Sequence, residues 1–192
     1  MAFPRATEFA HLLVSRHLRP GDRAVDATVG NGHDTLFLAE TVGTGGRVDG
    51  FEIQPDAIRA ARARLQEYPQ VILHQAGHET MAERLSPGRS AVMFNLGYFP
   101  SGDKGIITRA ETTLPALDAA LALLVDGGLL TVVVYPGHPG GEEEARAVDA
   151  WFARFESGPH RTLRCGPATI SPESAASPYL LALEKRETTV VS

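Results

Sequence analysis

Two glycines and an acidic residue with informative spacing lie early in the sequence, in VDATVGNGHDT, residues 25–35. Asp26 comes four positions before Gly30, and Gly32 follows Gly30 after one residue. Glycines at such a turn let a ligand approach the backbone. A dinucleotide fingerprint has a third glycine for the pyrophosphate, and this sequence has Thr35 at that position. The pattern favours S-adenosylmethionine, which has a cationic amino-acid end and no phosphate, over a nucleotide, and a purely structural turn is the third alternative.

Two further candidate binding residues lie at the end of the second expected strand and after the third. Glu52 lies about 20 residues after Gly32, where an acid accepts hydrogen bonds from ribose hydroxyls in both nucleotide and S-adenosylmethionine sites. In QAGHE, residues 75–79, Ala76 stands where many methyltransferases bind the adenine amino group with an aspartate. The sequence therefore leaves open which group binds adenine, and His78 is either a ligand contact or the start of a helix.

The segment AVMFNLGYFPSGDKG, residues 91–105, contains candidate residues for binding a methyl acceptor. An apolar strand ends at Asn95, and Tyr98 follows three positions later. Methyltransferases that act on amino groups of bases often have Asp, Asn or Ser here, then two prolines and an aromatic residue. The polar side chain orients the amine and the ring stacks on the base, so positioning supplies most of the effect. This segment keeps both ends of the pattern without the prolines, and a simple turn is the alternative.

The elements expected around these segments alternate between strand and helix. Strands are expected at 23–27, 48–53, 71–74, 90–95, 129–135, 161–165 and 179–184, and helices at 7–18, 33–40, 55–68, 79–85, 112–125 and 142–155. This alternation predicts a parallel sheet with helices on both faces. The last two strands have no helix between them, which predicts an antiparallel pair. We therefore expect the α/β, Rossmann-like fold of class I methyltransferases that use S-adenosylmethionine (SAM): a seven-stranded, mostly parallel sheet with one antiparallel strand.

Length and composition are typical of one globular domain. The chain has 192 residues, 43% of them hydrophobic, a formal net charge of -5 and one cysteine, Cys165. We expect a single domain over residues 1–192, with an N-terminal helix at about 6–18 and a C-terminal strand pair at about 160–185. No run approaches the roughly 20 apolar residues of a membrane helix, and no signal peptide is visible, so we expect a cytoplasmic protein without a membrane partner.

Charge and metal-ligand patterns limit the expected partners. The negative net charge argues against sequence-independent DNA coating but allows local recognition of RNA. Glu142, Glu143 and Glu144 have no His or Cys at ligand spacing, so we expect them to favour the dipole of a helix N-terminus and not to bind metal. Whether the chain forms a homodimer is left open by the sequence.

Three segments, DATVGNGHDTLFLAE, NLGYFPSGDKGIITRAETT and VVYPGHPGGEEEA, resemble the YtqB-like family of rRNA methylases. This family is similar to the MnmM-type tRNA methyltransferases, which convert wobble 5-aminomethyl-2-thiouridine to its methylaminomethyl form. The resemblance extends from about Pro4 to Glu184. It implies S-adenosyl-L-methionine as cofactor and the anticodon region of tRNA as substrate. The implied cofactor site consists of Asp26, Thr28, Gly30, Asn31, Gly32, Asp34, Thr35, Glu52, Ile53, Gln54, Gly77, His78 and Asn95.

Other polar and aromatic residues are candidates for proton transfer and for RNA contacts. Asp103 or His138 can take the proton of the amine, with water as the alternative. Lys104 and Arg109 are expected to contact tRNA phosphates, with a solvated charged loop as the alternative. Tyr98 and its neighbour Phe99, together with His138, complete the expected substrate contacts. Two rival functions remain: methylation of rRNA or of a small amine, and a non-catalytic RNA-binding module that retains the cofactor fold.

Overall fold

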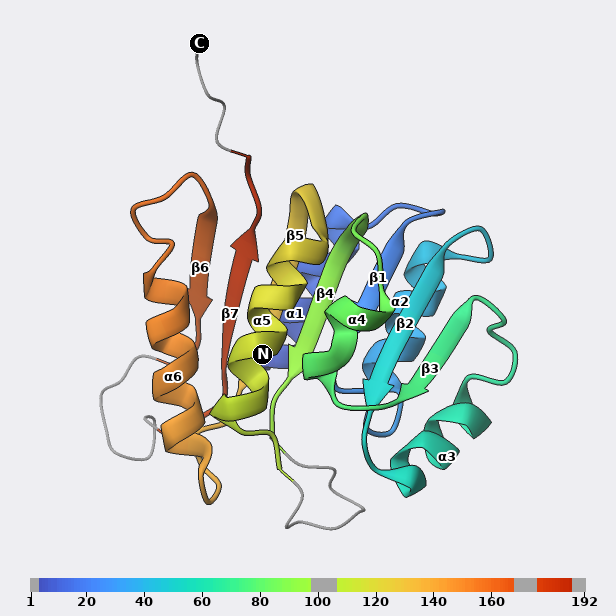
Figure 1. Ribbon diagram of the computed structural model, residues 1–192, viewed down its shortest axis with the longest axis horizontal. Coiled ribbons are helices and arrows are strands. Elements are labelled where there is room, and N and C mark those ends of the chain that lie inside the picture. The colour runs from blue at the N-terminus through green and yellow to red at the C-terminus, as the bar shows by residue number, and fades with distance from the viewer. Residues whose placement is uncertain (1–3, 98–106, 168–175, 188–192) are drawn as a thin grey trace.

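The computed structural model describes residues 4–97, 107–167 and 176–187. A seven-stranded sheet with the order β3-β2-β1-β4-β5-β7-β6 forms its centre (Figure 1). Its strands are β1 Arg23–Asp26, β2 Arg47–Glu52, β3 Val71–Gln75, β4 Arg89–Asn95, β5 Leu124–Val134, β6 Arg161–Cys165 and β7 Tyr179–Glu184. Strand β7 is antiparallel to β5 and β6, and the other neighbouring strands are parallel. The predicted mostly parallel sheet with one antiparallel strand is confirmed.

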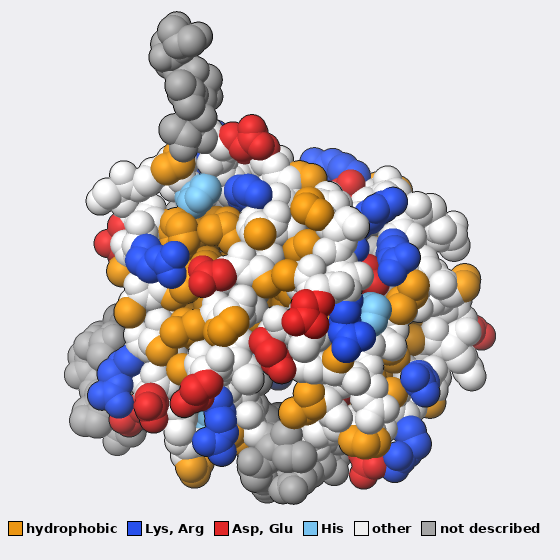
Figure 2. All heavy atoms as spheres, viewed as in Figure 1, with side chains coloured by type: hydrophobic (Ala, Val, Ile, Leu, Met, Phe, Trp, Pro, Cys, Tyr) orange, Lys and Arg blue, Asp and Glu red, His pale blue; other side chains and the backbone are white. Residues whose placement is uncertain are grey.

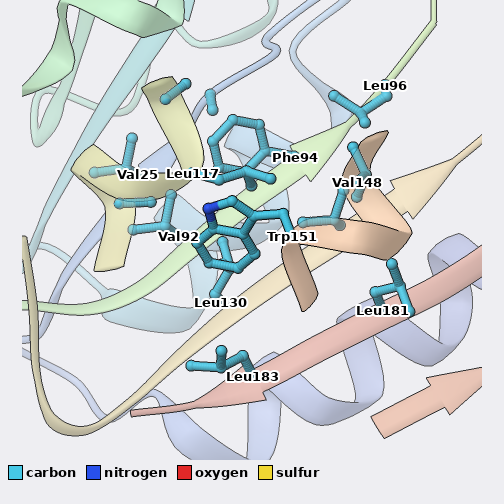
Figure 3. Close-up of a cluster of buried hydrophobic side chains, with 14 of the residues drawn as sticks. Val25, Val92, Phe94, Leu96, Leu117, Leu130, Val148, Trp151, Leu181 and Leu183 are labelled. Atoms are coloured by element: carbon cyan, nitrogen blue, oxygen red, sulfur yellow. The ribbon is translucent and has the colours of Figure 1, made fainter. Parts of the chain in front are cut away.

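Helices cover both faces of this sheet. They are α1 Ala6–His17, α2 His33–Val42, α3 Pro55–Arg64, the 3-10 helix η1 His78–Thr80, α4 Met81–Arg84, α5 Ala110–Leu123 and α6 Gly141–Ala153. One apolar core joins α1 and α2 to the sheet, and a second joins α4, α5 and α6 to its other face. Figure 3 shows the second core, in which Trp151 of α6 lies beside Val92, Leu117 and Leu130. Alternate side chains of each central strand therefore enter different cores.

Several helices end earlier than the sequence predicts, and the ends of α3 and α5 have a visible cause. Helix α3 ends at Arg64, and the chain then turns, with the Tyr68 N–H donating to the Leu65 carbonyl. Tyr68 precedes a proline, and the residue before proline disfavours the helical region. Helix α5 ends at Leu123 and β5 begins at once, so Asp126-Gly127-Gly128 lies in an irregular part of a strand and not at the end of a helix.

The apolar face of α1 also differs from the expected one. The helical spacing of Phe9, Leu12 and Leu13 in the sequence predicts that they share one apolar face. In the structure Ala10 and Val14 are buried, whereas Leu12 is 47% exposed. The core-facing stripe of a helix is set by its docking angle, and small residues such as Ala10 allow close approach. Within the described ranges, no helix is both long enough and apolar enough to span a membrane.

Candidate active site

A cavity of about 670 Å³ opens at the carboxyl ends of β1, β2, β4 and β5. Strand β1 lies between β2 and β4, so the chain continues from β1 to one side of the sheet and later returns to the other side. Open α/β sheets bind ligands at such a switch in strand order. The volume is in the range of small-molecule sites. The predicted site residues that line the cavity are Thr28, Gly30, Asn31, Asp34, Glu52, Ile53, Gln54, Gly77, His78, Asn95, Arg109 and His138.

Asp26 and Thr35 lie beneath the cavity wall and are almost fully buried. The carboxylate of Asp26 accepts the Thr28 N–H at 3.0 Å and the Thr35 hydroxyl at 2.6 Å, and thereby shapes the turn between β1 and α2. Burial raises the pKa of Asp26 to about 7, and the nearby negative charge of Asp34 adds to this effect. Both residues therefore support the turn from below.

The two glycines of this turn have different roles. Gly30 and Gly32 both have positive φ angles, 50° and 77°, which favour glycine. Gly30 lines the cavity, whereas a Cβ on Gly32 would lie 3.2 Å from the Cβ of Ala61 in α3. Gly32 therefore allows α2 and α3 to pack together. From the same helix, Arg64 Nε donates to the Asn31 carbonyl at 2.8 Å.

Glu52 lies at the end of β2 and connects two segments of the cavity wall. Its carboxylate accepts the Gly30 N–H at 3.0 Å and the Gln54 N–H at 2.8 Å. A carboxylate has about four lone-pair sites, so each oxygen can still accept a bond from a ligand hydroxyl. Beside it, the apolar side chain of Ile53 is 50% exposed and lines the cavity, where it offers a surface for a planar ring.

His78 begins η1 and is only 8% exposed. Its Nδ1 lies 3.2 Å from the Ala27 carbonyl, which only accepts hydrogen bonds, so Nδ1 bears the proton and Nε2 is an acceptor. Nε2 is buried and has no hydrogen-bond partner among the described residues. Burial lowers the pKa of His78 and keeps the ring neutral. His78 thus starts a helix and also presents a buried hydrogen-bond acceptor at the cavity, whereas the side chain of Ala76 has no polar atom.

Asn95 is held at the end of β4 by two hydrogen bonds. Its backbone N–H donates to Thr28 Oγ1 at 2.7 Å, and its Nδ2 donates to Asp34 Oδ2 at 3.1 Å. The other carboxylate oxygen of Asp34 lies 2.7 Å from Nε2 of His11 in α1. The His11 ring stacks on Phe37 with a centroid distance of 4.0 Å and an interplanar angle of 5°. His11 was not predicted from the sequence, because no local pattern relates it to residues in α2 or β4.

Glu144 ties together the segments on either side of residues 98–106. The Thr108 hydroxyl accepts the Gly97 N–H at 2.8 Å and donates to Glu144 at 2.7 Å, and the Thr113 hydroxyl donates to the other Glu144 oxygen at 2.7 Å. Glu144 is 3% exposed, whereas Glu142 and Glu143 are exposed. The sequence predicts for Glu144 only a favourable interaction with the helix dipole. The structure adds a second role, because its buried carboxylate accepts hydrogen bonds from two hydroxyls.

The segment after β5 supplies the opposite wall. Tyr135 and His138 both line the cavity, and burial raises the pKa of Tyr135, with a smaller effect from the charge of Asp34. His138 was predicted from the sequence as a substrate contact, whereas Tyr135 was not. Exposed Arg109 lies at the start of α5 on the same cavity.

Several predicted site residues lie outside the described residues: Tyr98, Phe99, Asp103 and Lys104. In the part of the chain that is described, no group of three or more His, Cys, Asp or Glu residues is arranged to hold a metal ion.

Comparisons with known proteins agree with this geometry. Residues 48–184 match the family model described as "Putative rRNA methylase". The chloroplastic tRNA (mnm(5)s(2)U34)-methyltransferase of Arabidopsis thaliana is 42% identical over 160 residues, which are 77% of this chain. The alignment spans 58% of the plant protein, so this chain covers less than two thirds of that relative's length.

Two solved structures share the whole fold. A "putative rRNA-methylase" from Clostridium thermocellum has a TM-score of 0.90 and 38% identity, covering 96% of this chain and 100% of its own. A "putative methyltransferase" from Streptococcus mutans, in complex with SAH, has a TM-score of 0.84 and 31% identity, covering 96% and 99%. The predicted class I methyltransferase fold and the family resemblance are thus confirmed. Because the family model matches more than half of its residues, the chain belongs to the family described as "Putative rRNA methylase".

Proposed function

We propose that the chain is an N-methyltransferase that uses S-adenosyl-L-methionine to methylate the aminomethyl group of wobble 5-aminomethyl-2-thiouridine in tRNA. The observation that supports this most directly is the position of Asn95. It lies at the carboxyl end of β4 and on the same cavity as the glycine turn and Glu52. The names of two similar proteins agree with the proposal: the Arabidopsis protein is a tRNA (mnm(5)s(2)U34)-methyltransferase, and the Streptococcus structure contains SAH.

The residues of the cavity fit this cofactor. The Glu52 carboxylate would accept the ribose hydroxyls, and Ile53 would pack against the adenine ring. The buried Nε2 of His78, which has no partner among the described residues, would accept the adenine amino group in place of the aspartate that is absent at Ala76. When bound, S-adenosylmethionine supplies a methyl group activated by its sulfonium sulfur.

The protein's own contribution is to orient a neutral amine and to accept its proton. Asn95 Oδ1 would accept an N–H of the amine and thereby direct the nitrogen lone pair, because Nδ2 of the same amide is turned toward Asp34. His138, which lines the cavity, and Asp103 are the candidates for the proton acceptor, with water as the alternative. We propose direct transfer to nitrogen without a covalent bond to the enzyme.

Recognition of tRNA is proposed to be local. On the face shown in Figure 2, Lys and Arg side chains are interspersed with Asp and Glu, and no extended basic surface covers it. Arg109 is exposed at the cavity and would contact phosphates of the anticodon region together with Lys104. Tyr98 and Phe99 are proposed to stack on the wobble base. We also propose that residues 1–192 act as one domain in the cytoplasm.

The decisive experiment measures transfer of labelled methyl from S-adenosylmethionine to bulk tRNA from cells that lack this gene, followed by nucleoside analysis. We expect label in methylaminomethyl-thiouridine, no label in an unmodified transcript, and loss of transfer in Asn95→Ala. Gln66→Ala, which changes an exposed residue after α3, serves as the control. Label in rRNA or in a small amine instead would replace the proposed acceptor. Failure to bind the cofactor would favour an RNA-binding module without catalysis.

A further inference from the structure

We infer that Asp34 and His11 are positioning residues for the methyl acceptor, acting through Asn95. Asp34 selects which end of the Asn95 amide faces the acceptor, and His11 of α1 holds Asp34 in place for this task. The inference rests on the proposed function. It gives Asp34 a different role from the cofactor contact that the family resemblance implies.

The orientation of the Asn95 amide decides which group it presents to the acceptor. An amide side chain has two orientations of nearly equal shape, one presenting an acceptor oxygen and the other two N–H donors. Asp34 Oδ2 lies 3.1 Å from the Asn95 amide, and an ionised carboxylate can only accept hydrogen bonds. The amide nitrogen must therefore face Asp34, and Oδ1 must point to the other side. An amine that keeps its lone pair for a methyl group needs this acceptor, because the flipped amide would donate into the lone pair.

The backbone beneath this side chain is also held in place. The Asn95 N–H donates to Thr28 Oγ1 at 2.7 Å. Thr28 belongs to the same turn as Gly30, on the part of the cavity where we propose that the cofactor binds. The backbone of Asn95 is therefore fixed relative to this turn, and only the rotation of its side chain remains to be controlled. Asp34, in the first turn of α2, controls this rotation.

Asp34 is itself held in place by a residue of α1. Its second oxygen accepts a hydrogen bond from His11 Nε2 at 2.7 Å, and the side chains of His11 and Asp34 are 32% and 12% exposed. His11 cannot swing freely, because its ring lies parallel to Phe37 at 4.0 Å. Both Asp34 oxygens thus bind protein groups that come from α1 and β4. Helix α1 lies outside residues 48–184, so the family model does not cover this contribution to the site.

A three-variant experiment separates positioning from cofactor binding. In Asp34→Asn, the new amide can donate to Asn95 Oδ1 and turn that oxygen away from the acceptor. We expect kcat for transfer to aminomethyl-containing tRNA to fall about 100-fold, as for a misplaced reacting group, while the SAH Kd measured by calorimetry changes less than about threefold. His11→Phe keeps the stacking on Phe37 and removes the hydrogen bond, and we expect a decrease of about tenfold in kcat.

The reciprocal double variant Asp34→Asn with Asn95→Asp provides a test by rescue. It restores a carboxylate–amide pair with the partners exchanged and leaves an acceptor oxygen of the new carboxylate for the amine. We expect kcat of the double variant to be at least about tenfold higher than that of Asp34→Asn. Asn95→Asp alone places two carboxylates together and should be inactive. A residue with a merely structural role would show additive losses.

A spectroscopic measurement makes the test independent of any acceptor. The side-chain NH₂ signal of Asn95, assigned by its loss in Asn95→Ala, should be shifted downfield and exchange slowly in the wild type. We expect both features to disappear in Asp34→Asn and to weaken in His11→Phe, with thermal unfolding confirming that each variant is folded.

The outcomes distinguish this inference from the proposed function. An unchanged Asn95 signal in Asp34→Asn, or a loss of SAH affinity of tenfold or more with kcat retained, would overturn the inference. If the wild type transfers no methyl to tRNA but the signal depends on Asp34 and His11 as expected, the proposed acceptor fails while the inferred orientation of the amide stands.

Discussion

The carboxylate of Glu52 at the end of β2 accepts the backbone N–H of Gly30 at 3.0 Å, so the acid and the glycine turn form one continuous wall of the cavity. The second oxygen accepts the Gln54 N–H at 2.8 Å. These two contacts fix the carboxylate while leaving lone pairs for a ligand. Glu52 can therefore present acceptors to a diol without having to order its side chain when the ligand binds.

Replacing Glu52 tests this arrangement. We expect Glu52→Gln to weaken SAH binding at least about tenfold, because hydrogen bonds to a charged acceptor contribute about 1.5–3 kcal/mol. Isothermal titration calorimetry measures the change. Glu67→Gln removes an exposed carboxylate after α3 and should leave the Kd unchanged. Equal affinity of Glu52→Gln and wild type would remove Glu52 from the cofactor site.

His78 is expected to recognise the adenine amino group. His78→Phe preserves much of the ring volume and removes the acceptor Nε2, so SAH affinity should fall about fivefold to tenfold. The sharper measurement compares SAH with its deaminated analogue, S-inosylhomocysteine. Wild type should prefer SAH, and His78→Phe should lose most of that preference. A preference that survives in His78→Phe would assign adenine recognition to another group.

Glu144 is expected to matter for stability because it is the buried acceptor of two hydroxyls. In Glu144→Gln, one carboxylate oxygen becomes an NH₂ group that must face Thr108 or Thr113, so that hydroxyl has to accept instead of donate, and both contacts lose their charged acceptor. We expect the free energy of unfolding to fall by about 1–3 kcal/mol in urea denaturation. Glu143→Gln, one residue earlier and exposed, should change it by less than about 0.5 kcal/mol. Equal stabilities would show that the Glu144 contacts contribute little.

Asp26 should make stability depend on pH. Burial, followed by the charge of Asp34, raises its pKa to about 7 from the ordinary aspartate value of 3.8. Between these values the folded state binds more protons than the unfolded state, so this group's contribution to stability falls as pH rises from about 4 to about 7 and is then constant.

Asp26→Asn removes this titration and retains an acceptor for the Thr28 N–H. The stability of Asp26→Asn relative to wild type should therefore increase as pH is raised from 5 to 8 in urea denaturation. A difference that is constant with pH, or that has the opposite slope, would contradict the raised pKa.

Local pattern was sufficient to predict much of this protein. All seven strands were predicted, and the bounds predicted for β6 and β7 match the structure, whereas β5 begins five residues before its predicted start at 129. Runs of apolar residues and glycine turns reflect interactions between near neighbours in the chain, so they are visible in the sequence. The same logic placed Glu52 and Asn95 at strand ends, and parallel strands bring such ends to one edge of the sheet.

Errors occurred where packing overrides local preference. Leu12 fits a helical apolar stripe but is exposed, because the docking of α1 places Ala10 and Val14 against the sheet. Gly32 follows the pattern of a ligand-binding glycine, and the structure adds a packing contact that this pattern does not predict, because a Cβ there would lie 3.2 Å from the Cβ of Ala61 in α3. Neither fact is visible without knowing which helix lies beside which.

By itself, therefore, the sequence determined the order of strands and helices, the glycine turn and the two polar strand ends, because each depends on residues close together in the chain. Only the tertiary structure decided which side chains support them. The contact between His11 and Asp34 spans 23 positions, that between Thr108 and Glu144 spans 36, and that between Asp34 and Asn95 spans 61. Such pairs form only after helices cross the sheet and dock, and no short-range periodicity specifies the angle at which they do so.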